Sequence, residues 1–538
     1  MIHNSIDGAP LGAFDACVVG SGPAGLVFSL EMAKRGKRVL LIESGGVKVN
    51  ELQTSLSHAE IVDPDRHDDM RIAVSRRLGG TSNLWGGRCQ PLDTIDFADR
   101  PWIGSQWPLE LTELLPYYEA ACHYLSAGKP VFHDETDTKP NSKFRIALER
   151  FSNKPKVQKA FWQELSASPL IDIRLNTTLT SVISRNHKVE SIVVTSTDGL
   201  KTKIPVDRLV IACGGLESTR QLLIMQREQP DLFGGADGVL GKNYMGHIIG
   251  EVADIIFNDP REVSKFDFIV DRHGSYTRRR FVPADRLQRD LSLLNVSFWP
   301  VVPPIADPGH QNAALSAVCM ALASPVIGKL FIAEAIRKRH IPRSIDWMGH
   351  LKNVLTGMPE AMRFVPWFVY NRYFTEMRLP GFFVRNTSGR YGLAYHCEQS
   401  PSLQSRVTLS EKTDRFGAPK LVIDIRFSDS DAEALLRAHA ALGEWLSSQN
   451  FGRLEFRQPV AETVNSILLQ ASHGTHQIGT IRMGQNRANA IVDSNLEAFD
   501  CKNLYVVSSA VFPSSGQCNP TLTIAALAAR LANTIGRP

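Results

Sequence analysis

The chain has 538 residues, of which 43% are hydrophobic and 21% are charged, and its formal net charge is +5. This length allows two or three packed lobes, and the composition is ordinary for a globular protein. The small net charge gives nucleic-acid binding no global electrostatic support. No uninterrupted apolar stretch approaches the ~20 residues needed to span a bilayer, and the first ten residues carry no secretory signal. We therefore expect a cytoplasmic protein.

Eight cysteines are scattered singly along the chain. None of them forms a Cys-x-x-Cys pair, so the sequence suggests neither a zinc site nor a redox dithiol. Dispersed thiols are more typical of a reducing compartment than of a disulfide-bonded secreted protein.

The first predicted elements are a buried strand over residues 14–20, a helix over 26–35 and a second strand over 38–43. Between the first strand and the helix stands Gly20-Ser21-Gly22-Pro23-Ala24-Gly25, a Gly-x-Gly-x-x-Gly motif. In this context Gly20 permits a tight turn, Gly22 lets the backbone approach a pyrophosphate, and Gly25 lets helix and strand pack closely. The alternative is a tight turn in some other α/β protein.

The helix that follows the motif adds free N–H groups and a positive dipole end, which suit phosphates. Glu43 ends the second strand, where its carboxylate suits a ribose hydroxyl and would repel the 2′-phosphate of NADP. These features predict a dinucleotide site, although the motif by itself does not separate FAD from NAD.

The middle of the chain reads as strands. Residues 172–208 alternate between apolar and polar side chains around turns at 186–187 and 198–199, which predicts a β-meander. Motifs become scarce beyond about residue 250. Residues 395–399 read as a strand, and alternation resumes over 405–409 and 420–426.

The segment 326–385 combines basic and aromatic residues. It contains ten Lys or Arg against four Asp or Glu, including Arg337-Lys338-Arg339-His340, and ten of the chain's forty-three aromatic residues. Such a composition can contact an anionic membrane surface, a partner subunit or, as a lid, the substrate entrance. The plainest interpretation is a helical insertion with a solvated basic face.

Two residues near the C-terminus suggest the chemistry. His476 opens the run His-Gln-Ile-Gly-Thr-Ile-Arg-Met-Gly, and Asn519 precedes Pro520 and an apolar helix over 521–534. A histidine can accept a proton at neutral pH, and an asparagine amide can hold the oxygen that loses it. With a dinucleotide site in the same chain, the pair predicts alcohol oxidation. The alternative for His476 is a structural histidine.

No metal site is expected. His473 lies one helical turn before His476, but a glycine stands beside it and no third ligand is clustered with the two. We therefore expect a structural role for His473. His247 and His396 are further pocket candidates, with a structural role favoured for each.

With both ends considered, the chain resembles the glucose–methanol–choline (GMC) oxidoreductase family. The resemblance rests on the glycine motif, the C-terminal block, residues 77–87 (RLGGTSNLWGG), residues 209–223 and residues 241–247. Residues 77–87 look like the family's loop beside the isoalloxazine ring, and residues 209–223 look like the strand and turn that return to FAD. Trp85 and the run from Asn519 look closest to the pyranose-oxidase and bacterial sugar-dehydrogenase branches.

The resemblance implies an α/β fold with two parts. The first is a Rossmann-like FAD-binding domain with a β-meander, built from residues 1–99, 168–249 and 462–538. The second is a substrate-binding domain of residues 100–167 and 250–461, built on an antiparallel sheet with helices and carrying the insertion 326–385. The expected cofactor-binding residues are Gly20, Ser21, Gly22, Pro23, Ala24, Gly25, Glu43, Ser44, Gly80, Thr81, Asn83, Leu84, Trp85, Gly86, Gly87, Ala212, Gly214, Ala510, Asn519, Pro520 and Thr521.

The implied reaction oxidises a CH–OH group of a sugar, glycoside or other polyol, with the hydride passing to flavin N5 and the proton to His476. FAD is expected to be non-covalent, because Leu84 stands where several pyranose oxidases carry a flavin-linked histidine. Glu398, Gln399 and His396 are candidate substrate contacts. Oxygen, a quinone or a protein could accept the electrons. The alternatives are a hydroxynitrile-lyase-type enzyme, a sterol or aliphatic alcohol oxidase, or a flavin-binding protein that has lost its chemistry.

Overall fold

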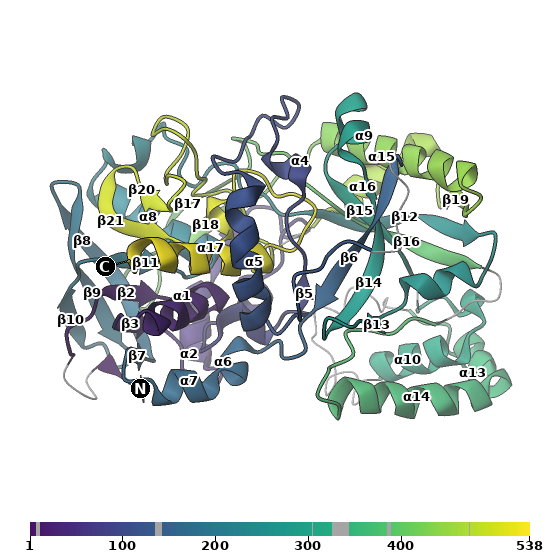
Figure 1. Ribbon diagram of the computed structural model, residues 1–538, viewed down its shortest axis with the longest axis horizontal. Helices are drawn as coiled ribbons and strands as arrows, with labels where there is room; N and C mark the ends of the chain where they lie inside the picture. The colour runs from purple at the N-terminus through teal and green to yellow at the C-terminus, as the bar shows by residue number, and fades with distance from the viewer. Residues whose placement is uncertain are drawn as a thin grey trace.

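The computed structural model describes residues 1–6, 11–134, 142–303, 305–324, 344–384, 389–472 and 474–537. Two large β-sheets dominate it, one mostly parallel and one antiparallel, and each carries its own helices (Figure 1). This arrangement confirms the predicted α/β fold class. The domain boundaries given above stay a prediction.

The mostly parallel sheet forms around the N-terminal strand β2 (Ala16–Val19), whose four residues are all buried. A continuously apolar strand of this kind suits the centre of a sheet that is covered on both faces. The strands follow the spatial order β1 (Ile2–His3), β7 (Ile171–Arg174), β3 (Val39–Ile42), β2, β11 (Leu209–Ile211), β21 (Cys501–Val506), β9 (Lys188–Ser196) and β10 (Lys201–Pro205).

The predicted β-meander is confirmed at one edge of this sheet. Strand β8 (Thr177–Arg185) pairs antiparallel with β9, and β9 pairs antiparallel with β10. Asn186 and His187 both have φ near +50° to +57°, which the primed two-residue turn of a tight hairpin requires. The short strand β20 (Glu497–Ala498) pairs with β21.

Three helices pack together against the parallel sheet and bring distant parts of the chain into one layer (Figure 1). They are α1 (Pro23–Lys34), α5 (Leu111–Tyr124) and α17 (Thr521–Ile535). Helix α17 is buried along most of its length. It is rich in alanine, and these small side chains allow α1 and α5 to approach it closely. Helix α8 (Gly215–Glu228) follows β11 directly. As a result, the glycine motif and the C-terminal block share one core.

The antiparallel sheet forms the second lobe. In spatial order its strands are β19 (Gly452–Phe456), β12 (Ile248–Phe257), β16 (Arg390–Cys397), β15 (Val296–Val301), β14 (Tyr276–Pro283), β6 (Phe144–Phe151) and β5 (Arg88–Cys89), with β13 (Ile269–Val270) beside β14. Two groups of helices accompany it (Figure 1): α15 (Asp429–Ser448) and α16 (Val460–Gln470), and, at the other end, α10 (Ala313–Ala323), α13 (Trp347–Thr356) and α14 (Met358–Tyr373). The remaining α-helices in the described part of the chain are α2 (Glu51–Thr54), α3 (Met70–Ala73), α4 (Thr94–Phe97), α6 (Val157–Ala160), α7 (Trp162–Ala167) and α9 (Asp285–Asp290).

A third sheet has three strands and includes the segments at which alternation was predicted to resume. Of the strand predicted at residues 395–399, residues 395–397 end β16 in the antiparallel sheet, and residues 398 and 399 follow its end. The next two strands lie outside that sheet: β17 (Arg406–Thr413) pairs with β18 (Pro419–Asp424), and β18 pairs with β4 (Ala59–Ile61). The loop after β16 lets them leave that sheet, and Val407 and Ile423 are buried with Leu216 of α8.

Two predicted features lie outside the described residues, namely Arg337-Lys338-Arg339-His340 and His473. The described part of the basic aromatic segment is 344–384, which contains α13 and α14. Among the residues that the structure describes, no helix is long and apolar enough to cross a membrane.

Candidate active site

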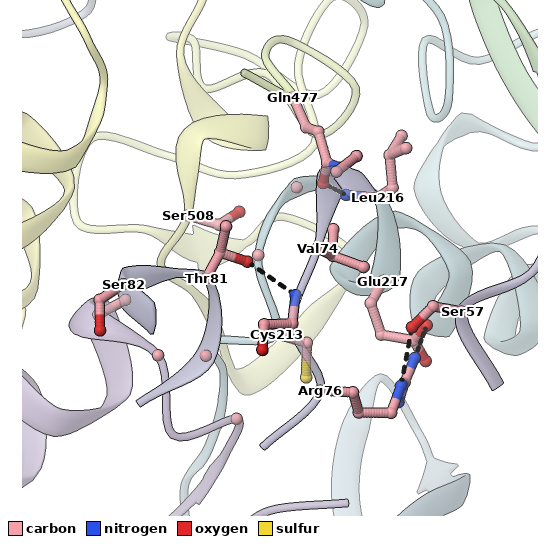
Figure 2. A pocket seen from close by; sticks show the side chains of 18 of the residues that line it. Ser57, Val74, Arg76, Thr81, Ser82, Cys213, Leu216, Glu217, Gln477 and Ser508 are labelled. Carbon is pink, nitrogen blue, oxygen red and sulfur yellow. Dashed lines mark hydrogen bonds and ion pairs between the residues drawn. The ribbon is translucent and has the colours of Figure 1, made fainter. Parts of the chain in front are cut away.

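A cavity of about 800 Å³ lies where the glycine motif, the loop at residues 77–87, the start of α8 and the C-terminal block meet. Figure 2 shows Thr81 of the loop, Glu217 of α8 and Gln477 of the C-terminal block around it. Its size falls in the upper part of the ~300–1,000 Å³ range typical of cofactor and ligand sites.

The glycine motif has the close approaches that its sequence predicts. Gly20 has φ +102°, and a Cβ there would lie 2.5 Å from the carbonyl oxygen of Ala212. A Cβ on Gly25 would lie 1.9 Å from the carbonyl oxygen of Gly20, so only glycine lets the helix and strand meet. Gly22 faces open space instead. These contacts match the three roles of the dinucleotide motif.

The start of α1 is open to the cavity. The helix begins at Pro23, and no side chain caps its first N–H groups, so they remain available to an anion. Glu43 lines the same region. Its carboxylate accepts hydrogen bonds from the Ser21 backbone N–H at 3.0 Å, the Ser21 hydroxyl at 2.6 Å and the Gly45 N–H at 2.7 Å. The turn and the acidic group are therefore held as one unit, which fits a dinucleotide such as FAD.

The opposite side of this region carries an ion pair that sequence reasoning missed. Arg76 pairs with Glu217 at 2.7 Å and donates to the hydroxyls of Ser57 and Ser44, each at 3.0 Å (Figure 2). The arginine precedes the predicted loop by one residue. Glu217 lies within the predicted segment 209–223. The sequence did not indicate that Arg76 and Glu217 form an ion pair.

The loop at residues 77–87 contributes in two ways. Leu84, Trp85 and Gly86 line the cavity, whereas Asn83 donates to the carbonyl oxygens of Leu78 and Gly80 at 3.0 and 2.8 Å. Asn83 therefore shapes the loop from within. Trp85 is fixed by a 2.6 Å hydrogen bond from its indole N–H to the carbonyl oxygen of Pro155.

The structure brings His476 and Asn519 together at one end of the cavity. Asn519 Nδ2 lies 3.0 Å from His476 Nε2. An amide nitrogen can only donate, so His476 Nε2 is the acceptor and holds a lone pair, and the ring proton sits on Nδ1. Asn519 Oδ1 is buried and has no hydrogen-bond partner among the described residues.

His247 supports this tautomer. Its Nδ1 lies 2.9 Å from His476 Nδ1, so it accepts the proton that His476 donates on the side away from Asn519. Burial lowers the pKa of His476 well below its ordinary value, and the neighbouring His247 and Arg88 lower it further. His476 is thus held neutral, which a proton acceptor must be.

His396 completes a group of three histidines. Its ring stacks on His247 with centroids 4.2 Å apart and lies 5.6 Å from that of His476. His396 Nδ1 donates to the carbonyl oxygen of Gln517 at 2.7 Å, which leaves Nε2 as a buried atom without a described partner. Burial, and then the charges of its neighbours, lower the pKa of His396 well below its ordinary value.

The three histidines correct a premise about metal binding. The sequence suggested that no third ligand clusters with His476, but ligand nitrogens of His247, His396 and His476 all lie within 4.8 Å of one another. His247 lies just before β12 and His396 lies in β16, and both are far from His476 in the chain. The absence of a metal stays a prediction, but the lack of a third histidine near His476 no longer supports it.

Arg88 is a second residue that sequence reasoning missed. It lines the cavity beside His476, lies 4.3 Å from the ring centroid of Trp299, and pairs with the buried Glu149. Arg278 and Arg280 approach the same carboxylate, and burial, opposed by Glu149, lowers the pKa of each to about 10. Three guanidinium groups thus share one carboxylate, and Arg88 Nη2 is buried without a described partner. The cavity wall therefore carries surplus positive charge.

The proposed substrate contacts have other partners. Glu398 is fully buried and accepts two hydrogen bonds from Arg100, at 2.6 and 2.9 Å. The Gln399 side chain accepts from the Gly246 N–H at 2.8 Å and donates to the carbonyl oxygen of Arg426 at 2.7 Å. None of Glu398, Gln399 and His396 lines the cavity. Their contact with substrate stays a prediction.

Most of the expected cofactor-binding residues line the cavity. The exceptions are Gly25, Asn83, Gly87 and Ala510. Gly25 and Asn83 act through packing and loop geometry, as described above. Gly87 has φ +80°, and a Cβ there would lie 3.1 Å from the Cβ of Ser152. Pro520 and Thr521, where α17 begins without a side-chain cap, line the cavity beside Asn519.

Comparison with known proteins finds two matches along the chain. Residues 13–241 match the FAD binding domain, and residues 401–528 match the family described as GMC oxidoreductase. The 2-methyl-1,2-propanediol dehydrogenase of Mycolicibacterium austroafricanum is 22% identical over 97% of this chain and 95% of its own. The 6′′′-hydroxyparomomycin C oxidase of Streptomyces lividus is 31% identical over 25% of this chain and 23% of its own. Among solved structures, pyridoxine 4-oxidase from Mesorbium loti shares the fold, with a TM-score of 0.56, 16% identity, and coverage of 97% of this chain and 99% of that one.

Proposed function

We propose that the chain belongs to the GMC oxidoreductase family, because residues 13–241 match the FAD binding domain and residues 401–528 match that family, and that His476 and Asn519 form its catalytic pair. The chain is an FAD-dependent oxidoreductase that acts on CH–OH donors. We propose a sugar, a glycoside or another polyol as the substrate.

The observation that carries the proposal is the 3.0 Å contact between Asn519 Nδ2 and His476 Nε2 at the edge of the cavity. An alcohol must lose its hydroxyl proton as well as a hydride. The lone pair on His476 Nε2, which accepts the Asn519 N–H in this structure, can accept that proton when substrate replaces this contact, because Nδ1 already carries the ring proton toward His247.

The oxygen that loses the proton needs stabilisation. The Asn519 amide has two N–H donors, and one of them can hold the substrate oxygen without competing for its proton. The surplus positive charge at Arg88 favours negative charge developing on that oxygen. When bound, FAD supplies the hydride acceptor.

FAD is proposed to bind through the glycine motif and the start of α1 for its phosphates, Glu43 for a ribose hydroxyl, and the start of α17 for the flavin. The uncapped N–H groups of both helices support this arrangement. We propose non-covalent binding at residue 84, because the Leu84 side chain lines the cavity and cannot form a covalent bond to flavin.

The substrate class is supported by the relatives and by the wall of the cavity. Both curated relatives carry names that state a hydroxyl-bearing compound, a diol in one case and 6′′′-hydroxyparomomycin C in the other. Donor groups at Asn519 and Arg88 suit the oxygen atoms of such compounds. The electron acceptor is proposed to be oxygen, a quinone or a protein.

The test is anaerobic mixing of the FAD-loaded protein with a panel of sugars, glycosides, diols and simple alcohols. Loss of the visible absorbance of oxidised flavin with polyols, but not with simple alcohols, is the expected result. Readmission of oxygen then separates an oxidase, which regains the absorbance rapidly, from a dehydrogenase. If no alcohol reduces the flavin while a cyanohydrin is cleaved, the lyase alternative replaces the proposal.

A further inference from the structure

The helices α13 and α14 expose an unusual amount of apolar surface. Among the described residues, 28 large apolar side chains are exposed, and 13 of them lie between Trp347 and Met377. Met348, Met362 and Phe374 are 75%, 68% and 73% exposed. Exposed apolar side chains are ordinary when scattered, but a contiguous group of this size marks an interaction surface.

The exposed residues of α14 occupy more than one narrow stripe. At 100° per residue, the exposed positions between Met362 and Phe374 cover an arc of roughly 200° around the helix axis. Val365, Trp367 and Tyr370 belong to this arc, and Arg363 is the only charged residue on it. Ala361 is the only residue of α14 classed as buried among those whose side chains are described. The helix is therefore apolar over most of its outward circumference.

The inner side of α13 is fixed to the protein by polar contacts. His350 Nδ1 lies 3.0 Å from the hydroxyl of Ser316 in α10, and Asn353 Nδ2 donates to the carbonyl oxygen of Pro308 at 2.7 Å. A Cβ on Gly357, between the two helices, would lie 2.6 Å from the Cβ of Ala313, so the turn packs tightly on α10. The apolar side must therefore face outward, at the end of the molecule shown at the lower right of Figure 1.

We propose that the outward surface of α13 and α14, hereafter the α13–α14 surface, docks into the interface of an anionic lipid bilayer. A helix that lies in the plane of a membrane interface buries an apolar arc and keeps cationic residues near the headgroups. Trp347, Trp367 and Tyr370 suit that interface, where amphipathic rings accumulate. Lys352 and Arg363 are exposed beside them and match anionic headgroups.

A lipid surface fits these observations better than a protein partner. A protein partner buries one face of a helix and needs polar residues around the rim of the contact. The exposed arc of α14 is wider than one face and has almost no polar rim, which suits immersion in a continuous apolar medium.

A hydrogen bond links the end of α14 to a segment that lines the cavity. Arg372 donates to the carbonyl oxygen of Pro380 at 2.8 Å, and Pro380 lines the cavity. This inference goes beyond the proposed reaction and does not depend on it.

The experiment is co-sedimentation of the full-length FAD-loaded protein with vesicles of phosphatidylglycerol and phosphatidylcholine mixtures. We expect binding that rises with the phosphatidylglycerol fraction. The double variant Trp367→Ser with Phe374→Ser should weaken it by at least about tenfold, because two large apolar side chains no longer insert. Leu403→Ser, at a residue that is also exposed but lies outside this surface, is the matched control and should bind normally.

The flavin content and thermal midpoint of each variant verify that it is folded. Absence of binding to anionic vesicles would overturn the proposal. Equal binding of the double variant and the wild type would also overturn it, because another surface would then be responsible. Light scattering tests whether the surface binds a second copy of the chain instead. If the wild type forms a dimer that the double variant does not form, and no vesicle binding is seen, the α13–α14 surface is a dimer interface.

Discussion

Asn519 and Glu398 lie in the same lobe-to-lobe contact, yet their surroundings differ sharply. Asn519 lines the cavity, and its buried Oδ1 has no hydrogen-bond partner among the described residues. Glu398 lies behind the cavity wall, where two hydrogen bonds from Arg100 and one from the Asn295 N–H at 3.1 Å occupy its carboxylate. The Asn519 amide oxygen can still accept a hydrogen bond, whereas the Glu398 carboxylate already accepts those from Arg100 and Asn295.

This difference in hydrogen bonding distinguishes residues that can act on a ligand from residues that stabilise the wall of the cavity. Buried polar atoms normally find a partner, so an unused one that faces a cavity points to a ligand. Arg88 Nη2 and Asn519 Oδ1 both meet that description. The Glu398 carboxylate instead holds Arg100 and the Asn295 backbone in place.

His476→Ala should give the largest effect, a loss of about 10²–10⁴-fold in the rate of flavin reduction, because it removes the proton acceptor. Single-turnover reduction by a substrate found in the panel is the measurement. Bound flavin should stay at the wild-type level. His133→Ala, at an exposed histidine, is the control. Loss of FAD from the His476→Ala protein would mean that His476 has a structural role and does not serve the reaction.

Glu398→Gln should act on stability instead of chemistry. It leaves the buried Arg100 guanidinium without its carboxylate, at a cost of about 3–5 kcal/mol in the free energy of unfolding. Chemical denaturation measures this loss, and the rate per folded molecule should remain near that of the wild type. Glu411→Gln, at an exposed glutamate, should change little. A stable Glu398→Gln protein with a raised KM would support Glu398 as a substrate contact.

Asn519→Ala should reduce kcat by about 10²–10³-fold, the usual effect of removing one donor to a developing oxyanion. KM should change less, because the donor acts mainly on charge that appears during the reaction. Steady-state kinetics on a reducing substrate separates the two constants. An unchanged kcat would mean that the amide only orients the His476 ring.

The part of this site that could be predicted is the part carried by local sequence. Gly20, Gly22 and Gly25 act through backbone geometry that only glycine allows, so their spacing alone indicates the turn. The meander was visible because hairpin turns and alternation are local properties of the chain. His476 and Asn519 were found through the motifs that frame them.

The rest depends on packing between distant segments. His247 and His396 join His476 only because β12 and β16 are neighbours in the antiparallel sheet. The pattern of residues 395–399 indicates a strand, but it does not show that the Glu398 carboxylate pairs with Arg100. Arg88 follows a predicted loop directly, but its surplus charge depends on Glu149, Arg278 and Arg280, which come from β6 and β14.

Arg88→Met gives the smallest expected effect, and it tests whether Arg88 acts on His476 through its charge. Burial is the main cause of the lowered pKa of His476, and the positive charge of Arg88 contributes to it. Removing that charge favours the protonated ring, so the pKa of His476 should rise. Proton transfer needs the neutral ring, so the acid limb of the kcat/KM profile should move to higher pH. Arg88→Lys keeps the charge and should shift the limb less. If the limb of Arg88→Met stays in place, Arg88 belongs with Glu398 among the groups that only hold the wall.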